Sequence, residues 1–191
     1  MPTESLRVNV DDLSNFIKLL CSFSYKFNTF AEHFWREFSG LMPSDAIPGG
    51  ADESGEITYI ARFSVPAEYR PNLSRIHTLV GTLRKGRNYA EAPYQGRTVY
   101  GNVTSNLMVM CGQYSGRYKW YSPKFLFPPN CRLVIGGNED EIPLYIGKAV
   151  EGNEKLIGKL FSDTSVHTSK LISPYKGGEI THETFDLLTY C

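Results

Sequence analysis

The sequence lacks a net charge and a long apolar run, and each absence excludes a class of protein. Twenty basic residues balance twenty acidic residues in the 191-residue chain. This balance removes the electrostatic attraction on which nucleic-acid binders and polybasic membrane-surface proteins depend. No stretch is long enough and apolar enough to cross a bilayer. The first residues also lack the basic and apolar regions of a secretory signal, which favours a cytoplasmic location.

Paired cysteines and catalytic motifs are missing as well. The four cysteines lie far apart at Cys21, Cys111, Cys131 and Cys191, and no C-x-x-C occurs. This spacing gives a zinc site little support and favours reduced thiols. Neither G-x-S-x-G nor H-E-x-x-H occurs, and Gly158-Lys159 lacks the rest of a P-loop. His182-Glu183, with Glu179 nearby, makes a weak ligand cluster at most. We therefore expect no catalysis, no metal and no cofactor.

Aromatic residues and glycines are abundant and indicate a mainly β fold. The chain has 12 tyrosines, 11 phenylalanines and 17 glycines, and aromatic residues favour strands. Short alternating runs bounded by turn residues read as strands. They are residues 56–63, 97–103, 107–111, 118–121, 132–137, 143–150, 170–175 and 184–190.

The first 38 residues follow a different pattern. Apolar residues at helical spacing after capping candidates predict a helix over 11–20. Residues 21–38 fit both a helix and a strand. Large apolar side chains recur in this region, and we expect them to be buried on the rest of the chain or at a homodimer contact. They are Phe16, Phe23, Phe27, Phe30 and Phe34.

The rest of the chain presents the same signals twice in the same order. Each series begins with one of the two tryptophans, Trp35 and Trp120. A Gly-Gly pair, an acidic turn and a Tyr-Ile strand follow, then L79VGTL or L156IGKL, and then A92PYQG or S173PYKG. Two copies of so long a unit predict a pseudo-symmetric pair. The expected organisation is an N-terminal segment (1–34) packed on a first repeat (35–111) and a joint with a second repeat (112–191), all mainly antiparallel β.

These motifs, taken in order, resemble the DM-nine repeat family, whose members carry such repeats in tandem. The resemblance implies a pseudo-symmetric β fold without catalytic chemistry. Some members bind mannose through an Asp in the Gly-x-Asp turn and a Lys in the Gly-Lys step. Carried over, the Asp position is Asp52 in the first copy and Asn138 (or Glu139) in the second. The Lys position is Lys159 in the second copy and Thr82 in the first.

The resemblance favours a lectin-like protein that binds mannose-type glycans, in innate immune recognition. Secretion by an unconventional route would then take it out of the cytoplasm. The alternative is an intracellular adaptor or stress-responsive protein whose sugar site has decayed, with self-association through the N-terminal aromatic segment. Asp52 also fits a plain turn residue, and Lys159 also fits a solvated surface lysine.

Overall fold

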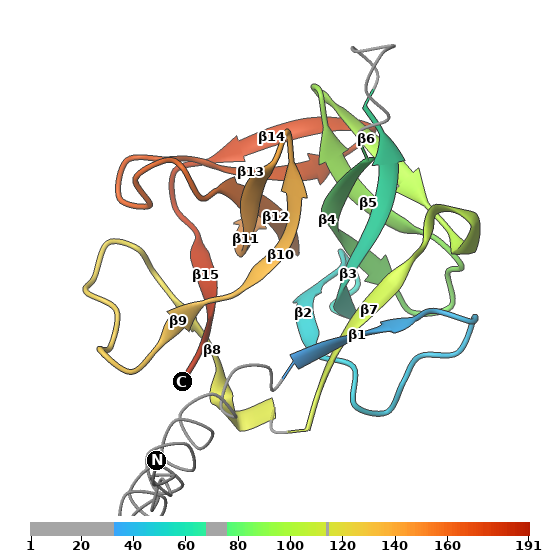
Figure 1. Ribbon diagram of the computed structural model, residues 1–191, viewed down its shortest axis with the longest axis horizontal. Coiled ribbons are helices and arrows are strands. Elements are labelled where there is room, and N and C mark those ends of the chain that lie inside the picture. The colour runs from blue at the N-terminus through green and yellow to red at the C-terminus, as the bar shows by residue number, and fades with distance from the viewer. Residues whose placement is uncertain (1–32, 68–75, 114) are drawn as a thin grey trace, which may run out of the picture. The chain divides into compact units, whose positions relative to one another are not determined.

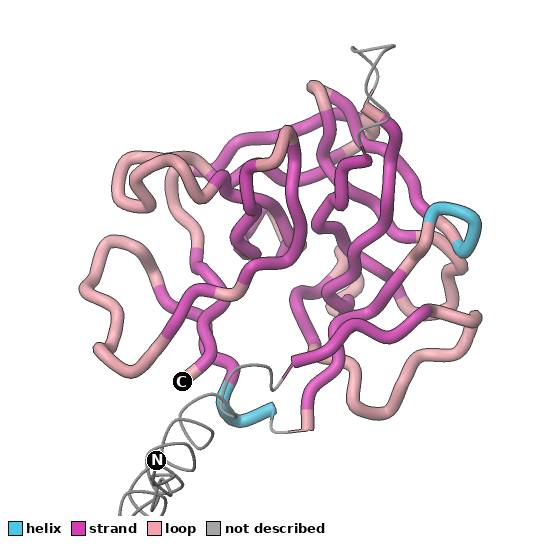
Figure 2. The backbone as a smooth tube through the Cα atoms, viewed as in Figure 1, coloured by secondary structure: helices cyan, strands magenta, loops and turns pink. Residues whose placement is uncertain are grey.

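The computed structural model describes residues 33–67, 76–113 and 115–191. The helix expected over 11–20 and the aromatic side chains Phe16, Phe23, Phe27 and Phe30 lie outside these residues. Within the described part, strands dominate and only two short 3-10 helices occur, η1 (Val103–Ser105) and η2 (Ser115–Arg117) (Figure 2). The expectation of a mainly β fold is therefore confirmed for the described residues.

Fifteen strands are formed by the described residues (Figure 1). In chain order they are β1 (His33–Glu37), β2 (Pro48–Ala51), β3 (Ile57–Pro66), β4 (Ile76–Arg84), β5 (Ala90–Tyr94), β6 (Arg97–Gly101), β7 (Met108–Gly112), β8 (Tyr118–Tyr121), β9 (Arg132–Leu133), β10 (Ile135–Glu139), β11 (Ile142–Glu151), β12 (Glu154–Phe161), β13 (Leu171–Tyr175), β14 (Gly178–His182) and β15 (Asp186–Tyr190). The sequence pattern marked most of them, and the ambiguous stretch up to residue 38 is a strand over His33–Glu37.

Every pairing between these strands is antiparallel. Eight of the strands close into a ring. The ring runs β3–β2–β12–β13–β14–β6–β5–β4 and returns to β3 through the β3–β4 ladder. Strands β10, β11, β15 and β8 continue from β4, while β7 and β1 continue from β3. Because β2 pairs with β12, β14 with β6 and β4 with β10, groups of three or four strands from the first and second parts of the chain alternate in the sheet.

The Gly-Gly pairs allow these contacts between the first and second parts of the chain. A Cβ atom on Gly50 would lie 1.9 Å from the carbonyl oxygen of Lys155, and one on Gly137 would lie 2.0 Å from that of Thr78. Only glycine permits so close an approach of two backbones. The motif that marks the repeated pattern in the sequence is therefore the place where one part of the sheet docks on the other.

The central hydrophobic core draws on both parts of the chain. Ile60, Val80 and Met110 pack in one cluster with Ile146 and Ile157. Two further clusters each draw on one part of the chain, one around Phe63 and Leu79 and the other around Leu160 and Leu171.

Two expectations about side chains need correction. Phe34 keeps 38% of its surface exposed, so the β structure does not bury it, and its burial at a homodimer contact stays a prediction. Cys131 and Cys191 form a disulfide, and only Cys111 is free among the described cysteines. The wide sequence spacing concealed this pairing, because β9 and β15 become neighbours only in the folded sheet.

Candidate functional site

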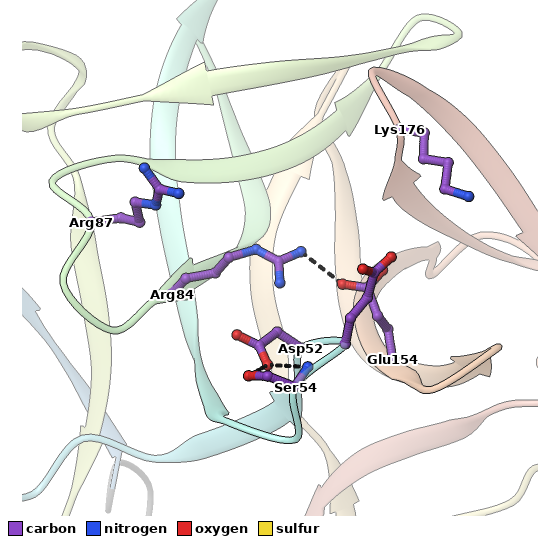
Figure 3. A pocket seen from close by; sticks show the side chains of 7 residues that line it. Asp52, Ser54, Arg84, Arg87, Glu154 and Lys176 are labelled. Atoms are coloured by element: carbon purple, nitrogen blue, oxygen red, sulfur yellow. Dashed lines mark hydrogen bonds and ion pairs between the residues drawn. The ribbon is translucent and has the colours of Figure 1, made fainter.

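An open pocket of about 430 Å³ lies where four connections between strands meet (Figure 3). The β2–β3 turn contributes Asp52, Glu53 and Ser54, while Arg84 and Arg87 come from the end of β4 and the loop after it. Glu154 opens β12, and Lys176 lies in the β13–β14 turn. The lining therefore combines both parts of the chain and holds three carboxylates and three basic groups.

Asp52 is held in place by its own turn. One carboxylate oxygen, Oδ1, accepts hydrogen bonds from the Ser54 backbone N–H (2.9 Å), the Ser54 hydroxyl (2.6 Å) and the Glu56 backbone N–H (3.0 Å). The Ser54 hydroxyl makes the largest contribution to lowering the pKa of Asp52, helped by the two backbone bonds and by Arg84. The group is thus ionised at neutral pH. Its second oxygen, Oδ2, makes no hydrogen bond within the described residues.

Arg84 is fixed by two carboxylates, Glu154 of the pocket lining and Glu91 of the neighbouring strand β5. Its Nη2 donates to Glu154 Oε1 at 3.1 Å (Figure 3). Its Nε lies 3.8 Å from Glu91 Oε1. Both carboxylates are less than a quarter exposed, which reduces the screening of these pairs by water. Arg84 therefore presents a guanidinium of fixed orientation at the centre of the pocket.

Arg87 and Lys176 flank the pocket without an ion pair among the described residues. The Arg87 guanidinium lies 5.9 Å from the ring centroid of Tyr89, and the Lys176 ammonium lies 4.8 Å from that of Tyr175. A hydrogen bond and a charge interaction with Tyr175, together with Glu53 and Glu154, raise the pKa of Lys176. Fixed carboxylates and cations around one hollow suit a ligand that both donates and accepts hydrogen bonds.

Lys159 is not at the pocket but inside the protein. Only 2% of it is exposed, so the reading as a solvated surface lysine does not hold. Its ammonium donates to Glu139 Oε2 (2.5 Å) and to the Pro93 carbonyl oxygen (2.9 Å). Ala51, beside Asp52, pairs with Lys155, and four residues of strand separate Lys155 from Lys159 by roughly 13 Å. The structure therefore does not bring Asp52 and Lys159 into one pocket.

The other two carried-over positions also lie outside the pocket lining. Thr82 is 4% exposed in β4, and its hydroxyl has no hydrogen-bond partner within the described residues. Asn138 accepts a hydrogen bond from the Thr78 backbone N–H at 3.1 Å and so supports the β10–β4 contact. Asp52 alone of the four lines the pocket.

Several pocket residues were not selected by sequence reasoning. Arg84 lies two residues after Thr82, the position carried over from the family, and Lys176 stands in the repeated Pro-Tyr-x-Gly step. Glu154 and Arg87 carried no signal, and Glu53 was visible only as part of the acidic turn, because nothing in the sequence brings the four turns together. The partner of Lys159 is Glu139, one residue beyond Asn138.

Other reactive groups remain isolated in the described part of the chain. No three His, Cys, Asp or Glu side chains gather there in a way that suits a metal ion. Burial raises the pKa of the Cys111 thiol to about 11, with Asp45 adding to the effect, so the thiolate is scarce at neutral pH. The same residues form no helix whose length and hydropathy would suit a membrane span.

Comparison with known proteins gives a likeness of fold alone. No protein-family model matches the sequence, and no curated protein matches it either. Among solved structures, the chain is similar to the crystal structure of the nematode sperm cell motility protein MFP2B, with a TM-score of 0.50 and 12% sequence identity. The match covers 83% of this chain and 46% of that one, so this chain corresponds to about half of its structural neighbour.

Proposed function

We propose that this protein is a non-catalytic carbohydrate-recognition protein that binds glycans of the mannose type in the pocket around Asp52. The observation that carries the proposal is the pocket lining. The Asp52 carboxylate with one oxygen free, the Arg84 guanidinium and the Lys176 ammonium surround one hollow. Neighbouring sugar hydroxyls donate to carboxylates and accept from cations, so this lining offers both kinds of partner.

The site proposed here differs from the one carried over from the DM-nine resemblance. Asp52 keeps its role as acceptor, but Lys176 and Arg84 replace Lys159 as donors. Both belong to the lining, whereas Lys159 is already committed to Glu139 and Pro93. Substituting Lys159 would therefore change sugar binding through the fold rather than through a lost contact.

We also propose that the chain consists of two tandem pseudo-symmetric repeats of the DM-nine type. Corresponding strands pair alike: β1 with β7 as β8 with β15, and β2 with β12 as β10 with β4. The two tryptophans also have matching partners. Arg62 lies 4.4 Å from the ring centroid of Trp35, and Lys148 lies 4.3 Å from that of Trp120.

The test of the function is a comparison of two Asp→Asn variants on a glycan array, followed by titration calorimetry. Asp52→Asn removes the charge that accepts from sugar hydroxyls, and we expect about a tenfold to hundredfold loss of affinity for mannose-type ligands. Asp163→Asn removes the same charge from an exposed turn outside the pocket and should leave binding unchanged. If wild type and Asp52→Asn bind mannose-type ligands equally well, the sugar does not bind at Asp52.

An adaptor role is the second candidate, and one surface feature favours it. Phe125 and Leu126, in the connection between β8 and β9, are 72% and 93% exposed. Adjacent apolar side chains in water suit a contact with a partner protein. If the wild type binds no sugar, a Phe125→Ser/Leu126→Ser variant tests this role by the loss of self-association or of partner capture.

The disulfide bears on where the protein acts. Such bonds persist in oxidising compartments and are rare in the cytosol. We therefore propose that the protein works in an oxidising setting, as the unconventional secretion considered above would provide. The number of free thiols, measured on protein whose thiols are blocked during isolation, tests whether the disulfide is formed where the protein acts.

A further inference from the structure

Strand β1 forms one end of the sheet, and its outer edge is open. It pairs with β7 and with no other strand of the described residues (Figure 1). Directly after β1, the Phe38 N–H donates to the Leu107 carbonyl oxygen across the same ladder. Hydrogen-bonded pairs recur at every second residue of an antiparallel ladder, so Phe34 and Arg36 also bond toward β7.

The alternate residues of β1 are His33, Trp35 and Glu37, and their backbone N–H and C=O groups therefore point away from β7. No strand among the described residues pairs with them on that side. The side chains of Phe34 and Arg36 are exposed on one face of β1. An edge strand with open backbone groups is a template for pairing with another strand.

The residues of β1 are complementary to a second β1 that runs in the opposite direction and is aligned with Trp35 opposite Trp35. Phe34 of each copy then lies opposite Arg36 of the other, where a guanidinium meets an aromatic ring. His33 of each copy lies opposite Glu37 of the other, where an imidazole N–H meets a carboxylate. Attractive pairs at directly opposed positions stabilise an antiparallel ladder.

The same register also satisfies the backbone, because it places all the outward-facing residues of each β1 in hydrogen-bonded pairs. A shift of the register in one direction sets Arg36 opposite Arg36, and like charges directly opposed destabilise a sheet. A shift in the other direction sets Phe34 opposite Phe34 and leaves Arg36 and Glu37 without partners in the second β1. Backbone and side chains therefore agree on the pairing about Trp35.

Strand β8, at the other end of the sheet, does not offer this match. The Cys191 N–H donates to the Arg117 carbonyl oxygen beside the β8–β15 ladder. The residues of β8 that face outward are therefore Tyr118 and Trp120. Pairing both of them with a second β8 sets Lys119 opposite Lys119, which is repulsive. The two ends of the sheet thus differ in their capacity to accept a second copy.

We infer that two copies of this chain associate through their β1 strands, which pair antiparallel about a two-fold axis at Trp35 and join the two sheets end to end. Such a contact is isologous and closes after two copies. It covers Phe34 and involves no residue of the pocket lining, so it does not rest on the carbohydrate function. Five residues from each copy make a small contact, and we expect a Kd of roughly 1–100 μM.

Sedimentation equilibrium of the full chain tests the association. The apparent mass should rise from 21.6 kDa toward twice this value as the concentration passes through the Kd. Glu37→Pro removes an outward N–H at an edge position where proline is tolerated, and it should raise the Kd at least tenfold. Glu37→Ala loses the same carboxylate but keeps the N–H, so this matched control should raise the Kd less. A wild type that stays monomeric throughout this range would overturn the inference, as would a folded Glu37→Pro that dimerises equally well.

Cysteine cross-linking tests the register independently. Phe34→Cys and Arg36→Cys are prepared separately in a Cys21→Ser background, while Cys111 is buried. Opposed residues of a non-hydrogen-bonded pair have Cα atoms about 4.5 Å apart, a separation that a disulfide can bridge. A mixture of the two variants should therefore form a cross-linked dimer on mild oxidation, whereas each variant alone should not.

The outcomes of these experiments separate the possible contacts. A cross-link formed by Phe34→Cys alone or by Arg36→Cys alone would show a shifted register and contradict the pairing. Absence of a cross-link in the mixture, at concentrations where the wild type dimerises, would place the contact elsewhere. Dimerisation that is kept in Glu37→Pro but lost in Phe125→Ser/Leu126→Ser would assign it to the β8–β9 connection and overturn the inference.

Discussion

Lys159 and Glu139 form an ion pair that is almost withdrawn from water, with side chains 2% and 12% exposed. Removing both charges from water is costly, and the short bond between them together with the Pro93 carbonyl oxygen offsets that cost. Asp52 is the opposite case, a carboxylate that is only partly buried and is fixed by its own turn. One acidic position after a Gly-Gly pair thus serves structure, and the other remains accessible to a ligand.

We predict that substituting Lys159 destabilises the protein mainly because the Glu139 carboxylate stays buried without a cation. The loss of the hydrogen bonds made by Lys159 matters less. Lys159→Met should lower the free energy of unfolding by about 3–5 kcal/mol, because Glu139 then stays buried without a cation. The double variant Lys159→Met/Glu139→Leu should recover most of that loss. Urea unfolding of wild type, single and double variants gives the comparison, and an equally unstable double variant would contradict the explanation.

Among the elements, β9 and β15 are joined covalently as well as by hydrogen bonds. Cys131 and Cys191 close a loop of 60 residues in sequence separation, and Thr189 and Tyr190 pair with Leu133 and Arg132 beside the bond. Strand β9 is only two residues long, so its ladder contributes little by itself. The disulfide therefore ties the end of the β8–β9 connection, at Cys131, to the last residue of β15's segment, Cys191.

We predict that reduction of this bond destabilises the protein by about 2–4 kcal/mol, since the unfolded chain gains the entropy of an open loop. Denaturant unfolding with and without a reductant measures the difference. A Cys131→Ser/Cys191→Ser variant should match the reduced wild type and show no further response to the reductant. Coincident unfolding curves for reduced and oxidised wild type would show that the bond is not formed in solution.

Considered as a whole, residues 33–191 fold around a core that neither part of the chain could complete. The cluster around Ile60, Val80, Ile146 and Ile157 mixes both parts, and the ladders β2–β12, β4–β10 and β6–β14 join them. Each part alone would expose strand edges and one side of this core. A single folding unit follows from this interleaving.

We predict that fragments 33–113 and 115–191 do not fold separately but associate when expressed together. Each fragment alone should show a disordered or aggregated state by circular dichroism and gel filtration, because its open edges and apolar face remain in water. The two fragments together should recover the β spectrum and melt cooperatively. Cooperative melting of either fragment alone would show that its own core suffices.

The sequence by itself determined the β class, most strand positions and the places of the Gly-Gly pairs, because alternation and turn chemistry are local properties. Asp52 was selected through the resemblance to the DM-nine family, and the structure shows that it lines the pocket. The tertiary structure alone decided that Lys159 is buried on Glu139, that Cys131 meets Cys191, and that Arg84, Glu154 and Lys176 share a pocket with Asp52. Those contacts join residues far apart in the chain, and their distances depend on how β2, β4, β10 and β12 interleave, which no local pattern encodes.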